Sequence, residues 1–365
     1  MFSALFIALS LIFVVKADHI YSATYLPSNI PEQTEDGQSG TNQCGTSVNQ
    51  SSLCQTAYMN AVDDWRAFSC SFLWTASINF AGRCLWAPPE PGPGSTIGET
   101  ERIEVAWCIK NGTGARLIPD GAIKGAHWLI TPDYIQVTGV GDMTKLNIPA
   151  DDEGGELDPH GADGNGNPVG GIVFSNAFGG QVEEIFEWTN FMGENNFCFR
   201  ICDPKGSNPA AYCQHIYDVL GCEWNMPANY DEGFDSCHAD SGEPMGVYGT
   251  STFHQGDGAT PDPHPAPKPT SCSTVSTIGN GFLIDGTSIL AVPSAKPTTS
   301  GSVTSSGRSG STAKPTGSAS RSTSGTAVGP TASSNSAGAS SWERRILGLW
   351  SALGLSLVGA VTVLI

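Results

Sequence analysis

Basic residues are scarce in this sequence. Its 365 residues include 17 Lys and Arg against 35 Asp and Glu, which gives a net charge of −18 and a pI near 4.6. Nucleic-acid-binding proteins need a basic patch or stripe to contact phosphate groups. The charge balance therefore excludes a nucleic-acid partner, and it favours solubility and mutual repulsion at a crowded surface.

Long helical patterns are also lacking. From residue 101 the apolar residues alternate with a period of two, and short apolar runs recur between turn signals such as Asn-Gly and Asp-Gly. These runs lie at 103–107, 117–118, 126–130, 134–137, 172–174 and 199–201. The pattern predicts a mainly β fold, a sandwich or barrel held by disulfides. One helix is expected at 51–65, where Leu53, Ala57 and Trp65 have near-helical spacing, with short helical pieces at 181–192 and 213–220.

No motif for metal binding is complete. In the segment 158–167, the oxygen-bearing side chains of Asp163, Asn165 and Asn167 alternate as Ca²⁺ ligands do, and Asp158 and His160 precede them. An EF-hand would need Gly at position 168 and Glu at 174, but Pro and Phe stand there. A Gly- and Asn-rich turn explains the segment as well. We therefore expect no cofactor, with a Ca²⁺ site at these five residues as the alternative.

No motif for catalysis is complete either. The stretch 240–244, with His127 upstream, resembles the nucleophile loop of trypsin-like proteases but lacks the second loop glycine, where Glu243 stands. A copper monooxygenase would need His19 as the first residue of the mature chain, and Asp18 is a poor residue to precede a cleavage site. The sequence predicts a protein that is not an enzyme.

Eleven cysteines are present, and the ends of the chain indicate that it is secreted. In a secreted protein, cysteines are expected to form disulfides rather than zinc sites. We expect ten of them to pair, with Cys70 left over, but the spacing does not reveal the partners. One pairing is excluded if 199–201 is a strand, because Cys198 and Cys202 would then lie about 13 Å apart. The ten are Cys44, Cys54, Cys84, Cys108, Cys198, Cys202, Cys213, Cys222, Cys237 and Cys272.

The organisation along the chain follows from composition. Residues 1–17 have the apolar core and small-residue end of a signal peptide. Residues 338–365 combine small residues, a short polar spacer and an uncharged apolar tail, which is typical of a glycosylphosphatidylinositol (GPI) signal with attachment at Asn335 or Gly338. A transmembrane helix is the competing interpretation. Between these ends we expect a loose lead-in at 18–40, a globular ectodomain at 41–270 and a disordered, O-glycosylated Ser/Thr/Pro-rich stalk at 271–337.

Several motifs resemble a known family. They are CLWAPP at 84–89, LIPDG at 117–121, TPDY at 131–134, ELDPHGADGNGN at 156–167, EWTNF at 187–191 and GEPMGVYG at 242–249. Together they resemble the macrophage-activating glycoproteins of basidiomycete fungi, and a cryptococcal immunoreactive mannoprotein is similar. The resemblance implies a secreted, mannosylated, often GPI-linked surface antigen. It brings no catalytic residues.

One stretch departs from that family pattern. The pattern runs from Asp-Asp-aromatic directly into CLWAPP, but here residues 66–83 lie between Trp65 and Cys84. This insert is apolar without a clear period and contains Cys70, the unpaired cysteine. A lineage-specific loop or a helix extension would explain it. We hypothesise instead a retained in-frame intron.

These observations predict an extracellular glycoprotein on the outer face of the plasma membrane or in the cell wall, held by a GPI lipid. N-glycosylation sequences occur at Asn49 and Asn111. The expected partners are cell-wall polysaccharide, or host lectin receptors that bind its glycans. Tryptophans could form a carbohydrate-binding platform, and Trp86, beside the Pro-rich stretch 87–94, is the one expected to be exposed. The alternatives are a wall-polysaccharide-binding module and a metal-dependent secreted enzyme.

Overall fold

The computed structural model describes residues 24–60 and 83–282. Within them the fold is mainly β with a few short helices and five disulfides, as the sequence predicts. No helix among the described residues is long and apolar enough to cross a bilayer.

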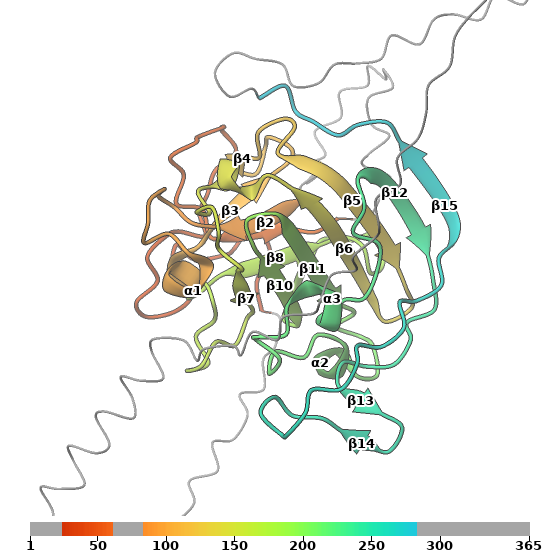
Figure 1. The fold of residues 1–365 in the computed structure, drawn as a ribbon. Coiled ribbons are helices and arrows are strands. Elements are labelled where there is room, and N and C mark those ends of the chain that lie inside the picture. The colour runs from red at the N-terminus through yellow and green to blue at the C-terminus, as the bar shows by residue number, and fades with distance from the viewer. Residues whose placement is uncertain (1–23, 61–82, 283–365) are drawn as a thin grey trace, which may run out of the picture. The chain divides into compact units, whose positions relative to one another are not determined.

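The largest element is a seven-stranded sheet in the order β15-β12-β5-β6-β11-β10-β7 (Figure 1). Its neighbours run antiparallel, except that β12 is parallel to β5. The alternating apolar runs near 130 and 200 form its centre. Its strands are β5 (Ile123–Ile130), β6 (Tyr134–Gly141), β7 (Gly155–Leu157), β10 (Trp188–Met192), β11 (Asn196–Cys202), β12 (Gly233–His238) and β15 (Thr270–Val275).

The remaining strands form three smaller sheets. They are β1-β8-β9, β2-β3-β4 and the hairpin β13-β14. Their strands are β1 (Thr56–Tyr58), β2 (Cys84–Ala87), β3 (Val105–Cys108), β4 (Arg116–Leu117), β8 (Ile172–Ser175), β9 (Glu183–Ile185), β13 (Val247–Tyr248) and β14 (Ser251–Thr252). The helical turns are α1 (Ile97–Thr100), η2 (Glu101–Ile103), η3 (Met143–Leu146), α2 (Pro209–Tyr212) and α3 (Gly221–Asn225).

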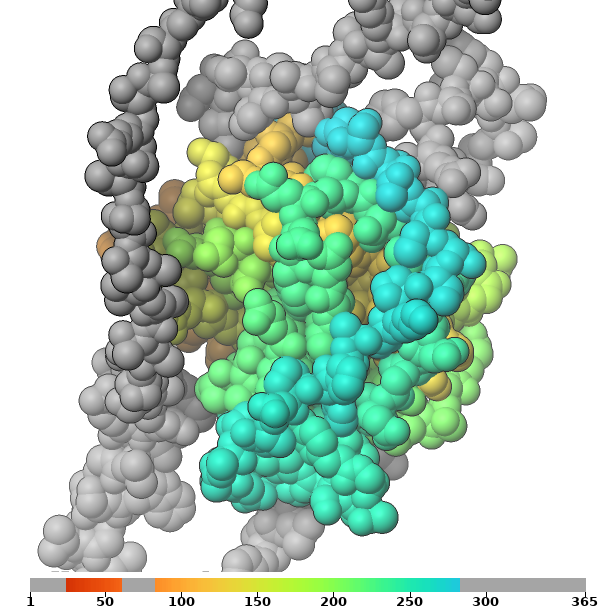
Figure 2. Space-filling model, turned by 45° about the vertical axis from the view of Figure 1, so that its right-hand side comes forward, coloured from red at the N-terminus to blue at the C-terminus, as the bar shows by residue number. Residues whose placement is uncertain are grey.

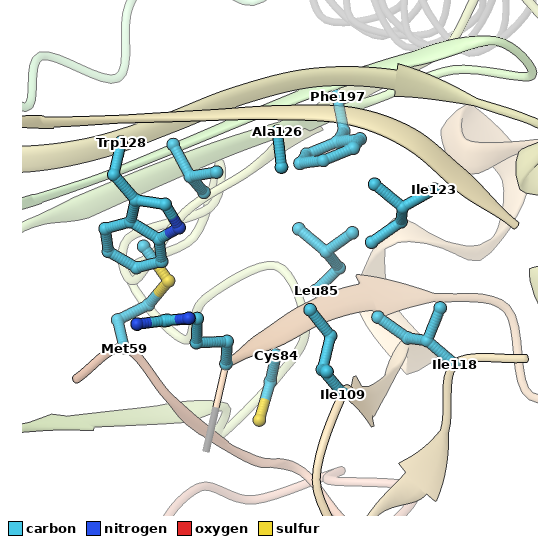
Figure 3. Close-up of a pocket in the computed structure, with 11 residues that line it drawn as sticks. Met59, Cys84, Leu85, Ile109, Ile118, Ile123, Ala126, Trp128 and Phe197 are labelled. Atoms are coloured by element: carbon cyan, nitrogen blue, oxygen red, sulfur yellow. The ribbon is translucent and has the colours of Figure 1, made fainter. Parts of the chain in front are cut away.

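The main core lies between the large sheet and the sheet β2-β3-β4, which makes the domain a sandwich. Leu85 of β2 faces Trp128 and Phe197 of the large sheet across a small apolar cavity of about 20 Å³ (Figure 3). Trp86 stacks on Trp188 with ring centroids 5.9 Å apart. Burial of such large aromatic side chains contributes most of the hydrophobic stabilisation in a core of this kind.

The helix expected at 51–65 is wrong for its described part, residues 51–60. Thr56–Tyr58 is strand β1, buried throughout and paired in parallel with β8. Leu53, which the helical pattern placed on the apolar face, is 46% exposed. The pattern failed because β1 is buried on both faces, so its short apolar run carries no period by which to tell strand from helix.

The other two helical predictions also need correction. Residues 181–192 contain the strands β9 and β10, which pair with β8 and β11. Residues 213–220 are irregular, and the helical turns α2 and α3 lie on either side of them. In the first segment, the neighbouring strands override a local helical pattern.

The domain extends beyond its expected boundaries at both ends. At its start, Glu184 Oε2 accepts hydrogen bonds from the backbone N–H groups of Thr24 and Tyr25, each at 2.7 Å, so the described part of the lead-in is docked rather than loose. At its end, β15 joins the large sheet beyond residue 270. The Asp120 carboxylate then accepts the N–H groups of Asn280 and Gly281. The stalk therefore cannot begin before residue 283.

The Pro-rich segment before β15 is held on the surface of the domain. Trp224 Nε1 donates a hydrogen bond to the carbonyl of Pro261 at 2.9 Å, and the Tyr248 hydroxyl donates to that of Asp262 at 2.7 Å. The ring of Tyr248 stacks on His264. In Figure 2 the cyan end of the described chain lies against the green surface of the domain.

Candidate functional site

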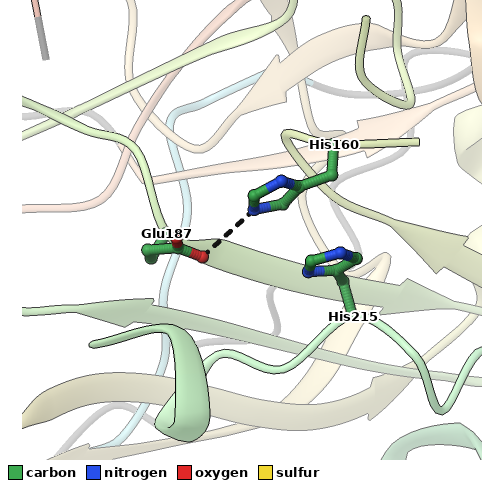
Figure 4. A group of neighbouring side chains, drawn as sticks. All are labelled: His160, Glu187 and His215. Carbon is green, nitrogen blue, oxygen red and sulfur yellow. Dashed lines mark hydrogen bonds and ion pairs between the residues drawn. The ribbon is translucent and has the colours of Figure 1, made fainter. Parts of the chain in front are cut away.

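Three side chains from distant parts of the sequence meet beside the edge strand β7 and its neighbour β10. His160 lies in the loop after β7, Glu187 immediately precedes β10, and His215 lies between α2 and α3 (Figure 4). We call them the His160 cluster. The pairing of β7 with β10, which places Leu157 opposite Asn190, brings the first two together.

Two disulfides fix the loop that carries His215. Cys213 is bonded to Cys202, and Cys222 is bonded to Cys198. Both partners lie on β11, so the loop 213–222 is attached to one strand at each end. A loop constrained in this way loses less conformational entropy when it orders a side chain. The prediction that Cys198 and Cys202 do not bond to each other is confirmed.

The cluster is compact and largely covered. His160 Nε2 lies 3.2 Å from Glu187 Oε2, and these two side chains are only 12% and 9% exposed. The rings of His160 and His215 stack face to face, with centroids 3.8 Å apart and planes inclined by 12°. One ligand atom from each of the three residues lies within 4.8 Å of the other two. The arrangement therefore offers two imidazole nitrogens and one carboxylate oxygen.

His215 is suited to act as a neutral base. Its Nδ1 atom is buried and has no hydrogen-bond partner among the residues that the structure describes. Burial, and to a lesser extent the neighbouring His160, lowers the pKa of His215 from 6.5 to about 4. At neutral pH its imidazole is therefore uncharged and keeps a nitrogen lone pair.

The loop that carries His160 is closed on itself. Asp158 Oδ1 accepts the N–H groups of His160 and Gly161 at 2.7 and 2.8 Å. The backbones of Asp158 and Asn167 form an antiparallel bridge across the base of the loop. Burial raises the pKa of Asp158 to about 6, although both N–H bonds and His160 oppose the shift. Asp158 thus orients the turn that positions His160.

Further carboxyl groups adjoin this loop. Glu156 is buried, accepts a hydrogen bond from Thr189 Oγ1 at 2.6 Å, and interacts with Asp158 and Asp218. Burial, followed by these like charges, raises the pKa of Glu156 well above its ordinary value. Burial and the same two aspartates raise the pKa of Glu101 to about 7. The region around His160 is consequently rich in carboxyl groups that hold protons more tightly than usual.

Of the five predicted metal ligands, the structure places only His160 in a group with other histidine and carboxylate donors. Asp163 instead forms a bidentate ion pair with Arg102, with Nη2–Oδ2 at 2.8 Å. The Asn165 backbone donates to Asp163 Oδ1 and accepts from Gly170, as in a tight turn. Sequence reasoning missed Glu187 and His215. A local motif could not reveal them, because no short spacing connects them to His160.

Comparisons with known proteins place the chain among fungal proteins. It is 45% identical over 269 residues to appressorium protein ROW2 of Mycosarcoma maydis, a match covering 72% of this chain and 86% of ROW2. The chain belongs to the ROW family of appressorium proteins. It is also 48% identical over 282 residues to ROW1 of the same fungus, covering 73% of this chain and 61% of ROW1. No protein-family model and no solved structure matches the chain.

In this ROW-family domain the expected tryptophan platform is wrong for Trp86. That side chain is completely buried, and Trp107, Trp128 and Trp188 are at most 4% exposed. The Pro-rich stretch after Trp86 suggested exposure, but strand β2 carries the residue into the core between two sheets. Trp224 is half-buried and bonded to the Pro-rich segment.

The serine-protease residues have other partners. His127 Nδ1 lies 3.0 Å from the Asp235 carboxylate, and its Nε2 lies 2.9 Å from the Asp231 carbonyl. Ser241 Oγ accepts the N–H of Asp133 at 3.2 Å, which stabilises a turn. The arrangement gives each residue a structural role.

The two N-glycosylation sequences lie on the surface. Asn49 and Asn111 are both exposed, and Asn111 precedes a turn at Gly112, whose φ is +102°. Both positions are therefore accessible to a glycosyltransferase. The GPI attachment candidates Asn335 and Gly338, the signal peptide, His19 and Cys70 lie outside the described residues.

Proposed function

We propose that this protein is a secreted fungal cell-surface glycoprotein, held by a GPI lipid and serving a structural or interaction role at the cell wall. The observation that carries the proposal is the set of five disulfides, which span the domain from Cys44 to Cys272. Such a set forms and persists in oxidising compartments, and it is rare in the cytosol.

The relatives support the same proposal. ROW1 and ROW2 are named as appressorium proteins, which suggests a fungal cell-surface protein. The chain spans only 61% of the length of ROW1. The two exposed acceptor sequences at Asn49 and Asn111 are consistent with glycosylation outside the cell. Mannosylation of the Ser/Thr-rich tail and recognition by immune cells are parts of this proposal that rest on composition and on the resemblance to macrophage-activating glycoproteins.

The test is release from membranes of fungal cells that express the full chain. Phosphatidylinositol-specific phospholipase should move the protein into the soluble fraction. A variant with both Asn335 and Gly338 replaced by bulky Leu should not become bound to the membrane in a form that the phospholipase releases. Recovery of peptides from 347–365 in the mature protein would contradict the anchor. Resistance of the whole surface pool to the enzyme would do the same.

Glycosylation is tested separately. The single substitutions Asn49→Gln and Asn111→Gln should each reduce the apparent mass by one N-glycan, and treatment with peptide N-glycosidase should abolish the difference between these variants and the natural chain. If neither substitution changes the mass, the exposed sequences are not used. That result would leave the anchor experiment unaffected.

A further inference from the structure

The His160 cluster indicates a property that is separate from the proposed surface role. We propose that His160, Glu187 and His215 bind one divalent transition-metal ion of the Zn²⁺ class. Two imidazole nitrogens and one carboxylate oxygen form a donor set that suits Zn²⁺ and its neighbours in the first transition series. Ca²⁺ needs six to eight oxygen ligands, so it fits this set poorly.

The separation of His160 and Glu187 agrees with shared ligation. Two ligands at about 2.0–2.1 Å from a tetrahedral ion lie about 3.3 Å from each other. His160 Nε2 and Glu187 Oε2 lie 3.2 Å apart, so an ion can bridge them with little change in their positions. A hydrogen bond between His160 and Glu187 accounts for this distance equally well. It does not account for the position of His215, the third residue of the cluster.

The third residue distinguishes the two explanations. A ring nitrogen of His215 lies within 4.8 Å of the donor atoms of the other two residues, yet its Nδ1 is buried with no hydrogen-bond partner in the described part of the chain. A buried polar atom without a partner is destabilising, so such atoms in a folded protein require an explanation. A metal ion explains why a second imidazole stands beside the first in a disulfide-anchored loop.

The surroundings of the cluster favour a cation. Glu156, Asp158 and Asp218 form a group of carboxyl groups beside His160. The positive charge of the nearby Arg102 is paired with Asp163. A carboxyl group beside a metal site orients the ligands by hydrogen bonds. Asp158 does so, since it fixes the turn from which His160 projects.

Binding requires one local movement. The lone pairs of imidazole nitrogens lie in the planes of their rings, and the two rings are stacked almost parallel. Both nitrogens can therefore point at a single ion only after one ring rotates out of the stack. Figure 4 shows the His160 ring joined to the Glu187 carboxylate and the His215 ring stacked on His160. Three protein ligands leave a fourth position open to water.

The experiment uses the full secreted chain, treated with a chelator and desalted. Zn²⁺ is titrated by calorimetry, and Co²⁺ is added to a second sample because tetrahedral Co²⁺ absorbs visible light. We expect one equivalent of Zn²⁺ to bind and to displace Co²⁺ with loss of its absorption. Ca²⁺ in large excess should not compete. Absence of a stoichiometric Zn²⁺ site, or displacement of Zn²⁺ by Ca²⁺, would overturn the proposal.

Variants identify the ligands. We expect Zn²⁺ binding to be weakened by more than about 100-fold in each of the variants His160→Ala, His215→Ala and Glu187→Gln. Loss of a residue that only supports a metal ligand already lowers the affinity by about 10–100-fold. His238→Ala is the matched control, since His238 is exposed on β12 and should leave affinity unchanged. Equal affinity in all four variants would show that binding is adventitious.

Folding is monitored independently of binding. Each variant is compared with the natural chain in its thermal transition and its content of free thiols. If an alanine variant does not fold, X-ray absorption on the natural chain loaded with Zn²⁺ decides instead. Scattering from two imidazole rings bound to Zn²⁺ supports the proposal. A Zn²⁺ coordination shell made of oxygen alone or of sulfur refutes it. Release by phospholipase tests the surface role, and it does not depend on any of these outcomes.

Discussion

Met59 and Arg83 form an antiparallel backbone bridge, although a long stretch of sequence separates them. The carbonyl of Arg83 also accepts the N–H of Ile109, and its guanidinium lies 4.7 Å from the centroid of the Trp128 ring. Residues 60 and 83, which flank the stretch outside the described structure, therefore lie next to each other at the edge of the core. A short turn could join them.

This proximity makes the retained-intron hypothesis testable by folding as well as by mass. If residues 66–83 are absent from the native protein, Trp65 takes the position of Arg83 opposite Met59, and residues 60–64 close the hairpin. Loops of five residues are common in hairpins. We expect a chain lacking 66–83 to be secreted and to unfold cooperatively, and we expect native protein to yield a peptide that joins Trp65 to Cys84. Any native peptide containing Cys70 ends the hypothesis.

Disulfides should dominate the stability of this domain. At about 2–4 kcal/mol for each isolated bridge, their loss exceeds the net stability of a typical domain. We expect full reduction to abolish the thermal transition measured by circular dichroism. Native protein should contain no more than one free thiol per molecule, and a higher count would contradict the pairing of the ten cysteines.

The position of each bridge predicts a different effect on metal binding. The Cys202–Cys213 bridge anchors the loop of His215, whereas Cys237–Cys272 joins β12 to β15. Replacing Cys202 and Cys213 with Ala should lower the affinity for Zn²⁺. Replacing Cys237 and Cys272 with Ala should leave that affinity unchanged. Both double replacements should reduce the melting temperature. Equal affinity in the two double variants would show that the loop needs no anchor.

Glu104 should make the domain less stable at alkaline pH. It is completely buried, accepts a hydrogen bond from Thr100 at Oε1, and its Oε2 has no partner among the described residues. Burial raises its pKa well above 4.5. The protonated form therefore contributes stability that is complete below pH 4.5 and is lost as the pH rises through the folded pKa.

The substitution Glu104→Gln removes that ionisation while keeping the shape. We expect it to raise the melting temperature at pH 8 and to leave it nearly unchanged at pH 4.5. Glu99→Gln, at an exposed position of α1, is the control and should have no effect at either pH. A shift of equal size at both pH values would mean that packing, not ionisation, is responsible.

The guanidinium of Arg200 should stabilise the domain more than that of Arg102. Arg200 is buried, donates two hydrogen bonds to Gln136 Oε1 and one to the Tyr212 carbonyl, and lies 4.1 Å from the centroid of the Tyr134 ring. Lys cannot reproduce this planar set of donors. Arg200→Lys should reduce the free energy of unfolding by about 2–4 kcal/mol.

Arg102→Lys is the matched comparison. Arg102 and Asp163 form an ion pair whose side chains are 40% and 48% exposed. Exposed pairs contribute little, so this change should cost less than about 1 kcal/mol. Urea denaturation of both variants measures the difference. Similar losses would show that the hydrogen bonds of Arg200 carry no special weight.

The central strands were predictable because their signal is local. In β5, β6 and β11 apolar side chains recur in short runs bounded by turn residues, and each run became a strand of the large sheet. The set of paired cysteines was also predictable, since oxidation follows from secretion and needs no knowledge of the partners. The exclusion of a Cys198–Cys202 bond came from strand geometry alone.

Tertiary structure decided what depends on distant partners. Sequence spacing could not show that Thr56–Tyr58 would pair with β8, or that Trp86 would be enclosed between two sheets. The alternative of a metal site at 158–167 stays a prediction, and for the same reason it missed Glu187 and His215. It followed neighbours in the sequence from Asp158 to Asn167, whereas His160 meets Glu187 through strand pairing and His215 through a loop attached by two disulfides. Sequence determined which cysteines of the described domain form disulfides and which central segments form strands, because both depend on residue type and local period. The tertiary contacts alone determined which side chains share a site.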